Sequence, residues 1–245
     1  MTPQPHELDS QYPDTWTKAK LVEPPASGFL HLALSTGTWK LPPALPSTAR
    51  RRLRDRLLAV AEEARVRPGV TEAHVFTVLV RPPGGGQAGS EIAYDVVLLI
   101  ETTDVAAAES LAGSDWWKAL AAAAQAESQD SLEFVASSPR RIAAVDHDRP
   151  GVFLFNYFSA PTVEKNLFAW QYTAGWFQDQ TGLDNSTVMQ PANGDPFTLV
   201  NHCRWDHLVD IMPSLVFKKS FREFVLKIFG ENGVEPRPLL YRLAG

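Results

Sequence analysis

The stretch that decides the fold is Phe197-Thr198-Leu199-Val200-Asn201-His202-Cys203-Arg204-Trp205-Asp206, followed by Ser214-Leu215-Val216-Phe217-Lys218-Lys219-Ser220-Phe221. It predicts a strand that leads into an amphipathic helix. Because strand side chains alternate, Asn201 and Trp205 share one face with the apolar residues at 197, 199 and 203. A buried amide needs hydrogen-bond partners. Two interpretations stay open: Asn201 bonds to neighbouring backbone while Trp205 fills the core, or both line a cavity for a flat, polar-edged ligand.

Composition bounds the class of protein. The chain has 245 residues, is 44% apolar and 21% charged, and carries a formal net charge of −5. These values are ordinary for a globular protein with a sizeable core. The negative charge gives no reason to expect a nucleic acid or an anionic membrane as a partner. The arginine run at 50–56 shares its helix with acidic residues, a pattern that favours a solvated helix face.

A single cysteine, Cys203, excludes an internal disulfide and a cluster of cysteine ligands, and it fits a reducing cytosol. The N-terminal residues lack the apolar segment of a signal peptide, and the longest apolar run, Val96 to Ile100, is too short to span a bilayer. We therefore expect a soluble, cytoplasmic protein. Residues 1–26, rich in proline and with Trp16 as their large anchor, predict an arm that lies over the body.

Hydrophobic periodicity predicts the same six elements twice: strand, helix, strand, strand, helix, strand. In the first half they fall at residues 28–35, about 48–67, 73–80, 92–100, 105–125 and 133–145, separated by Pro42, Pro43 and Pro46, by Pro68-Gly69 and by the loop at 82–86. In the second half they fall at 152–159, 163–181, 187–190, 197–205, from Ser214 onward and at 238–243. In the helix from Ser214 we expect these side chains to point inward: Phe217, Phe221, Phe224, Val225 and Ile228.

The repeated order indicates an internal duplication. Each half is a βαββαβ unit, which is the ferredoxin-like arrangement. One such sheet leaves a face bare, so two units in one chain can pack sheet against sheet. The prediction is an α+β fold in which tandem duplicated ferredoxin-like units form an intramolecular dimeric α+β barrel. Its parts are an arm (1–26), a first unit (27–146), a linker ending at residue 150 and a second unit (151–245).

The second half resembles the antibiotic biosynthesis monooxygenase family of dimeric α+β barrels. The resemblance rests on Trp205-Asp206 at the end of the third strand, a short helix at 208–212, and the Ser-x-x-aromatic helix start from Ser214 to Phe217. Anthrone-type oxygenases of this family use an Asn and a Trp four residues apart on that strand. The resemblance assigns these roles to Asn201 and Trp205.

The corresponding region of the first half, residues 101–104, has neither an Asn nor a Trp. The resemblance therefore implies one working pocket, in the second half, with the first half as a structural partner. Fused two-unit members similar to this chain occur among the ring-opening oxygenases of angucycline polyketide pathways. The resemblance thus implies an oxygenase in antibiotic biosynthesis that acts on an aromatic polyketide.

No metal site is readable from sequence spacing, because the six histidines form neither a His-x-x-x-His pair nor a facial triad. The sequence also lacks a dinucleotide-binding glycine motif, a phosphate-binding loop and a nucleophile elbow. We therefore expect no metal and no tightly bound cofactor. The electrons of an enzymatic reaction would come from the substrate or from a diffusible cofactor.

An electron-rich phenol or hydroquinone can supply the electrons of the reaction, since its deprotonated ring can pass an electron to dioxygen. The protein then needs a dry slot, a donor for the phenolate oxygen and a proton acceptor. Asn201 could hold the oxyanion and the N–H of Trp205 could donate beside it. His202 or His207 could take the proton. His202 points to the opposite strand face, so geometry favours His207; the alternative is that both are ordinary surface histidines.

An aromatic stripe, Phe168, Tyr172 and Trp176, lies beside the core face of the helix at 163–181. Such stripes usually pack in cores, yet three large aromatics at one pocket would suit a planar substrate. Asn156 and Tyr157 on the preceding strand are further candidates for substrate binding.

Three hypotheses remain. The first is an oxygenase that works unaided or with reduced FAD or FMN from a partner flavin reductase. The second is a haem-binding or haem-degrading barrel in which His31, His74 or His202 faces the slot. The third is a non-catalytic binding module. The sequence leaves open whether the chain forms a homodimer.

Overall fold

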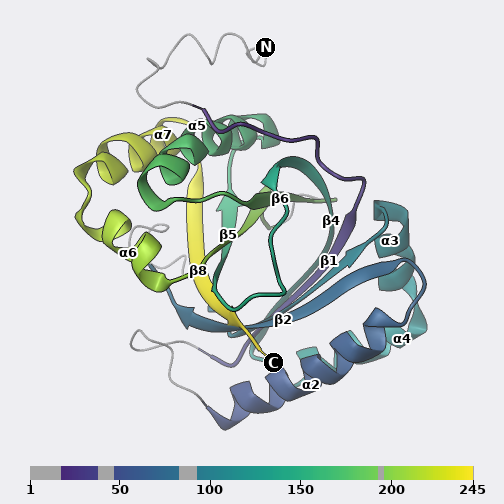
Figure 1. Ribbon diagram of the computed structural model, residues 1–245. Coiled ribbons are helices and arrows are strands. Elements are labelled where there is room, and N and C mark those ends of the chain that lie inside the picture. Colours follow the sequence, from purple (N-terminus) through teal and green to yellow (C-terminus); the bar gives the residue numbers. More distant parts are fainter. Residues whose placement is uncertain (1–17, 38–46, 83–92, 193–195, 245) are drawn as a thin grey trace.

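The computed structural model describes residues 18–37, 47–82, 93–192 and 196–244. In these ranges the chain forms a mixed α+β structure around a closed barrel of eight antiparallel strands (Figure 1). The strands are β1 (Gly28–Ser35), β2 (Val70–Val80), β3 (Val96–Thr102), β4 (Asp130–Ala143), β5 (Val152–Ser159), β6 (Ser186–Pro191), β7 (Leu199–Trp205) and β8 (Glu235–Leu243). The helices are α2 (Thr48–Arg65), α3 (Val105–Gly113), α4 (Asp115–Gln125), α5 (Val163–Thr181), α6 (Leu208–Phe217), the π-helix η1 (Phe221–Leu226) and α7 (Lys227–Glu231).

The strand order around the barrel is β1-β3-β2-β8-β5-β7-β6-β4, with β4 paired to β1. In each half the fourth strand therefore pairs with the first, the first with the third, and the third with the second. The halves meet where β2 pairs with β8 and where β4 pairs with β6. Two half-barrels thus join edge to edge, and each covers the exposed strand edges of the other.

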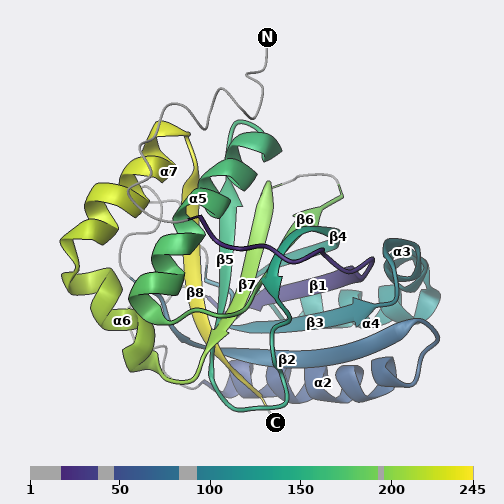
Figure 2. The same cartoon turned by 45° about the horizontal axis from the view of Figure 1, so that its top comes forward.

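Helices cover the outside of the barrel. In Figure 2, α2, α3 and α4 lie along the strands of the first half, and α5, α6 and α7 lie along those of the second half. Buried apolar side chains form three clusters: one between the first-half helices and strands, one between the second-half helices and strands, and one inside the barrel. The helix-facing and interior-facing sides of each strand therefore both belong to cores.

Strand β7 follows the predicted alternation. Leu199, Cys203 and Trp205 lie in the cluster beneath the second-half helices, whereas Val200 lies in the barrel interior. Phe197 departs from the prediction, because it contacts Tyr157 in the interior with ring centroids 5.3 Å apart. The reason is that β7 begins only at Leu199, so the alternation does not extend back to residue 197.

The predicted helix start at Ser214 is wrong. Ser214 lies inside α6, which runs from 208 through Pro213 to 217, and its hydroxyl donates to the backbone oxygen of Gln180 at 3.0 Å. The helical path stops at Lys218, where φ is −75° and ψ is 120°, and resumes as η1. This break turns Phe217 outward, where it is 80% exposed. Phe221, Phe224, Val225 and Ile228 are buried as expected.

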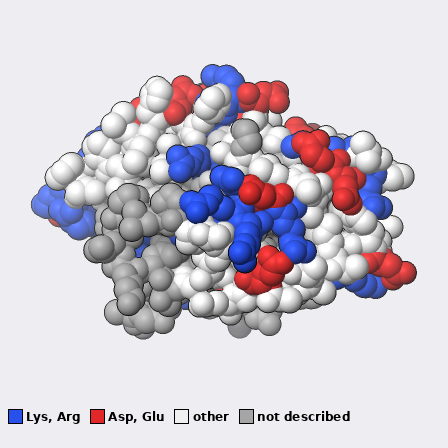
Figure 3. Space-filling model, turned by 90° about the horizontal axis from the view of Figure 1, so that it is seen from below, with Lys and Arg blue, Asp and Glu red and all other residues white. Residues whose placement is uncertain are grey.

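The arginine run lies on α2. Ion pairs join Arg54 to Asp55 and Arg56 to Glu127, and Figure 3 shows acidic and basic side chains next to one another on the face seen from below Figure 1. Arg50 is the exception to a solvated face. It turns inward and pairs with Asp95 at 2.6 Å, where both side chains are buried. No helix within the described ranges is long and apolar enough to cross a membrane.

The described part of the N-terminal arm touches the barrel, since the backbone N–H of Val22 donates to the oxygen of Arg141 on β4 at 3.0 Å and Ala19 is buried. Several features singled out in the sequence lie outside the described residues: Trp16, Pro42, Pro43, Pro46 and the glycines at 84–86.

Candidate active site

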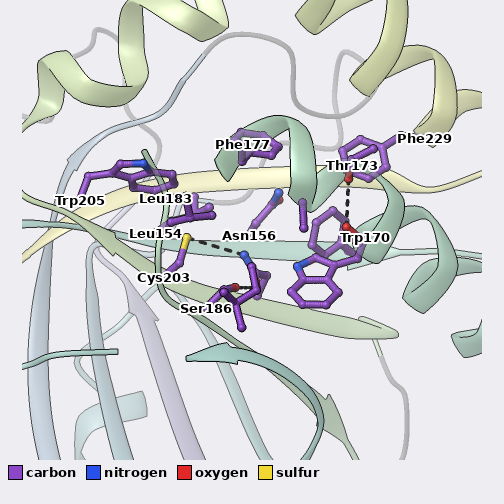
Figure 4. A pocket seen from close by; sticks show the side chains of 14 residues that line it. Leu154, Asn156, Trp170, Thr173, Phe177, Leu183, Ser186, Cys203, Trp205 and Phe229 are labelled. Carbon is purple, nitrogen blue, oxygen red and sulfur yellow. Dashed lines mark hydrogen bonds between the residues drawn. The ribbon is translucent and has the colours of Figure 1, made fainter. Parts of the chain in front are cut away.

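A cavity lies between the sheet of the second half and helix α5 (Figure 4). Strands β4, β5, β6 and β7 form its floor and α5 its roof. The lining residues are Ile142, Leu154, Asn156, Phe158, Trp170, Thr173, Ala174, Phe177, Leu183, Ser186, Asn201, Cys203, Trp205 and Phe229. Most are apolar, and the polar side chains are few, as in small-molecule sites.

Helix α5 presents Trp170, Thr173, Ala174 and Phe177 to the cavity, a spacing of three, one and three residues that gives one helix face. Its N-terminus is capped by the hydroxyl of Thr162, which accepts from the N–H of Lys165 at 3.2 Å. The side chains that pack α5 onto the sheet therefore also form the wall of the cavity.

Asn201 is buried at 6% exposure on the cavity floor. Its Oδ1 accepts from the hydroxyl of Ser186 at 2.5 Å, and its Nδ2 lies 3.7 Å from the Sγ of Cys203. Asn201 therefore bonds to side chains that line the cavity, whereas the first interpretation of the sequence had it bonding to neighbouring backbone. Because Ser186 donates to Oδ1, the NH2 group of Asn201 is directed to the other side, where one N–H donates to the Sγ of Cys203 and the second can serve as a donor within the cavity.

Asn156 lies directly opposite Asn201 in the β5–β7 register. Its Oδ1 is buried and has no hydrogen-bond partner among the described residues. An unpaired buried carbonyl costs about 1–3 kcal/mol, so its retention calls for an explanation. The two amides place a donor and an unsatisfied acceptor side by side in an apolar cavity.

The first half has no such pair. At the positions of β1 and β3 that correspond to Asn156 and Asn201, Leu32 faces Leu98. Both leucines are fully buried. Thr102 stands at the position of Trp205, because each is the seventh residue of its strand and faces the first residue of the neighbouring strand. The amide pair is therefore specific to the second half.

Trp205 lines the cavity, but its N–H is already used. Nε1 donates to the Oγ1 of Thr181 at 3.0 Å, so the expected donation of this N–H to a ligand does not fit the structure. The indole supplies a flat apolar wall. Burial raises the pKa of the Cys203 thiol, which stays protonated at neutral pH. Among the described residues, no carboxylate, histidine or lysine lines the cavity.

The two histidine candidates lie elsewhere. His207 caps the N-terminus of α6 and is exposed. His202 points into the barrel interior, as its predicted face requires, and is 2% exposed. Burial lowers the pKa of His202 well below its ordinary value. Neither side chain lines the cavity, so neither is placed to take a proton from a molecule bound there.

The aromatic stripe also lies outside the cavity. Tyr172 is stacked on Phe168 with centroids 5.7 Å apart, and Trp176 packs against Phe221 of η1 and donates to the hydroxyl of Ser220 at 3.1 Å. The stripe is shifted around α5 from the cavity face, because α5 packs on the sheet with one side and on η1 with another. Tyr157 is in the barrel interior, where its hydroxyl lies 3.1 Å from the Nε2 of His31.

Of the predicted site residues, the structure thus brings together Asn156, Asn201 and Trp205. Sequence reasoning missed Ser186 and Thr173 among the polar lining residues. Thr173 is buried three residues after Trp170 on α5, and this helical spacing could have indicated it. Ser186 is placed by pairing between β6 and β7, for which a single sequence gives no signal.

No protein-family model and no curated protein matches this sequence. Solved structures that are similar in fold include the following three. An anthrone oxidase-like protein aligns with a TM-score of 0.66 and 11% identity, covering 89% of this chain and 91% of its own. Candidate monooxygenases from Fusobacterium nucleatum and Lactobacillus acidophilus align with TM-scores of 0.57 and 0.51 and identities of 6% and 8%, covering 90% and 88% of this chain and 94% of each of theirs. At these identities the likeness shows a shared α+β barrel fold.

Proposed function

We propose that this protein is an oxygenase that binds a planar, electron-rich aromatic molecule in the second-half cavity. The observation that carries the proposal is the Asn156–Asn201 pair, which stands where the first half has two leucines. A buried amide costs stability unless its polar atoms are hydrogen-bonded, and the Oδ1 of Asn156 has no partner among the described residues. The similar structures include proteins named for anthrone oxidation and monooxygenation, which supports the reaction class.

The cavity suits a flat ligand. The cavity volume is about 30 Å³, so the walls stand close together. A ring system would enter by rotation of wall side chains such as Trp170 and Phe177.

In the proposed reaction Asn201 donates an N–H to the phenolate oxygen of the substrate, and the Oδ1 of Asn156 accepts from a second hydroxyl. A donor placed at a developing oxyanion contributes about 100- to 1,000-fold in rate. Since the described cavity lining contains no base, we propose that the substrate ionises by its own acidity. An anthrone or a hydroquinone of an angucycline-type polyketide meets this need, as the family resemblance implies.

For an anthrone the atoms and electrons balance with dioxygen alone. The ionised ring passes one electron to dioxygen, and the two radicals combine to a hydroperoxide at the ring methylene carbon. Cleavage of its O–O bond leaves one oxygen as the new carbonyl. The other departs as water with the two methylene hydrogens. Oxidative ring opening of a related polyketide would need an added reductant, for which reduced FAD or FMN from a flavin reductase is our proposed source.

The described lining of the cavity does not fit a resident flavin, because it holds no lysine or arginine for a phosphate. Nor does this described lining fit a histidine-ligated haem, because it contains no histidine. We further infer that the halves arose by duplication. The equal strand order and the matching register of β1–β3 and β5–β7 support this origin.

Oxygen uptake tests the proposal. The purified protein is given a hydroxylated anthrone, and separately a hydroxylated benz[a]anthraquinone, with and without reduced FMN. The test variant is Asn156→Leu with Asn201→Leu, which copies Leu32 and Leu98. We expect its uptake to fall at least 100-fold, because the oxyanion donor is removed. Tyr172→Phe is the control, since Tyr172 lies outside the cavity, and its uptake should equal that of the wild type.

The double variant should still fold. Its free energy of unfolding should change by less than about 2 kcal/mol, because removing the orphaned carbonyl of Asn156 offsets the lost bond between Ser186 and Asn201. Equal uptake by wild type and double variant would contradict the proposed site. Ligand binding without oxygen uptake under any condition would identify a non-catalytic binding module instead.

A further inference from the structure

Three side chains with metal-ligand atoms meet on the far side of the sheet from the cavity. Glu72 and His74 lie near the start of β2, and His147 lies in the linker between β4 and β5. The Oε2 of Glu72 is 3.1 Å from the Nε2 of His74 and 3.0 Å from the Nδ1 of His147. One ligand atom from each residue lies within 4.8 Å of the other two.

The tautomers of two histidines follow from their neighbours. The backbone oxygen of Leu154 can only accept, so the Nδ1 of His202, 3.0 Å away, carries a hydrogen. His202 is 2% exposed and stacked on Phe155 at 4.2 Å between centroids, surroundings that favour a neutral ring. Its Nε2 then accepts, so the Nε2 of His147, 2.9 Å away, must donate.

A neutral His147 is thereby left with a lone pair on Nδ1, and this lone pair faces a carboxylate oxygen of Glu72 at 3.0 Å. A metal ion held by both residues would bridge these two atoms. His74 brings a third nitrogen to within 3.1 Å of the same carboxylate oxygen, so three possible ligand atoms converge on one point.

We propose that Glu72, His74 and His147 form a binding site for one divalent transition-metal ion, and that this ion is Zn²⁺. Two imidazoles and one carboxylate are a common donor set for Zn²⁺ with an open fourth position. Tetrahedral geometry places ligand atoms roughly 3.3 Å apart, given metal–ligand bonds of about 2.0–2.1 Å. The two separations to Glu72 are slightly shorter than this, and the nitrogens of His74 and His147 lie within 4.8 Å of each other, so side-chain movements would adjust all three to the ion.

The surroundings support this site. A histidine ligand commonly donates its second N–H to a fixed acceptor, and His147 donates to His202, which donates to Leu154. The side chain of Glu72 is 48% exposed and that of His147 is 7% exposed, so solvent reaches the site from the Glu72 side. An ion here would fasten the linker to β2 of the first half and, through His202, to β7 of the second half.

Metal titration tests the site. The full chain, with any purification tag removed, is titrated with Zn²⁺ against a chromophoric chelator, and with Co²⁺ by visible absorption. We expect one ion per chain in the wild type and a higher thermal midpoint with Zn²⁺ than with a chelator. Glu72→Gln and His147→Gln should each weaken binding at least 100-fold and abolish the thermal shift. His202→Phe should weaken it about 10- to 100-fold, because it positions His147.

His207→Gln is the matched control, because His207 is exposed at the start of α6 and lies outside the cluster. It should bind Zn²⁺ as the wild type does. Glu72→Gln keeps the size of an exposed side chain, so it should fold, and far-ultraviolet circular dichroism of the chelated protein checks this. Equal affinities in the wild type, Glu72→Gln and His147→Gln would overturn the proposal, as would a wild type that binds no ion.

Discussion

At the scale of single residues, the polar groups buried in the barrel are the informative ones. Asn156 and Asn201 differ from Leu32 and Leu98 by a few atoms in size but by a donor and an acceptor in chemistry. A leucine pair completes a core, whereas an amide pair demands partners. The same two paired positions therefore carry apolar side chains in the first half and part of the candidate site in the second.

His31 gives a pH prediction at this scale. Its ring is fully buried, stacked on Phe134 at 4.6 Å, and burial lowers its pKa to about 3. The unfolded chain binds this proton near pH 6.5 and the folded protein only near 3. The stability contributed by neutral His31 is therefore complete above about pH 6.5 and falls by about 1.4 kcal/mol per pH unit as the pH drops toward 3.

The check is urea unfolding of the wild type and His31→Gln from pH 7 to 4. As the pH falls, the free energy of unfolding of the variant should decrease less steeply than that of the wild type, by about 1.4 kcal/mol per pH unit, the slope due to one proton. Tyr157→Phe serves as control, because it removes the hydrogen bond to His31 but leaves the histidine buried. It should lower stability by about 1 kcal/mol and keep the wild-type slope. Parallel slopes for wild type and His31→Gln would show that His31 does not control the acid sensitivity.

At the scale of elements, the end of α5 sets the width of the cavity roof. Gly182 stops the helix with φ 69° and ψ 20°, and its N–H donates to the oxygen of Gln178 at 3.1 Å. This left-handed conformation is unfavourable for a residue with a Cβ atom. The helix ends there because glycine adopts the conformation without strain, and Leu183 then turns into the cavity lining.

Gly182→Ala should therefore destabilise the protein by about 1–2 kcal/mol. An added Cβ at 182 meets no atom within 4 Å, so the cost comes from the backbone conformation alone. Gly113→Ala is the matched control, since its Cβ also meets nothing and its φ is not positive. That change should stabilise by about 0.5–1 kcal/mol. Thermal unfolding of both variants measures the difference; a Gly182→Ala midpoint at or above the wild type would refute the cap argument.

At the scale of the whole molecule, the halves share one interior. Phe76 of β2 packs against Phe153 and Phe155 of β5 with centroids 5.2 and 5.1 Å apart, and the hydroxyl of Tyr241 donates to the oxygen of Tyr94 at 3.0 Å. Separating the halves would expose this apolar cluster to water. We therefore expect the described barrel to unfold as one cooperative unit, although each half has its own helices.

Calorimetry tests this expectation. One transition should appear, with equal calorimetric and van't Hoff enthalpies. Leu57→Ala, at a fully buried first-half position, should cost about 2–5 kcal/mol and lower the midpoint of that single transition. Val66→Ala, at a position 84% exposed, should leave the midpoint unchanged. Two transitions, with only one moved by Leu57→Ala, would mean that the halves unfold independently.

The sequence by itself determined the order of the strands and the two faces of β7 from Leu199 onward, because alternation is a local pattern. The expected packing of sheet against sheet is replaced by pairing of strand edges, which closes the barrel. Tertiary structure decided the rest. It rotated α5 so that Trp170 and Phe177, and not Tyr172, face the cavity, and it set Asn156 opposite Asn201. It also brought His147 to Glu72, 75 positions away. Strand register, helix rotation and linker position follow from packing between distant segments, which no local period encodes.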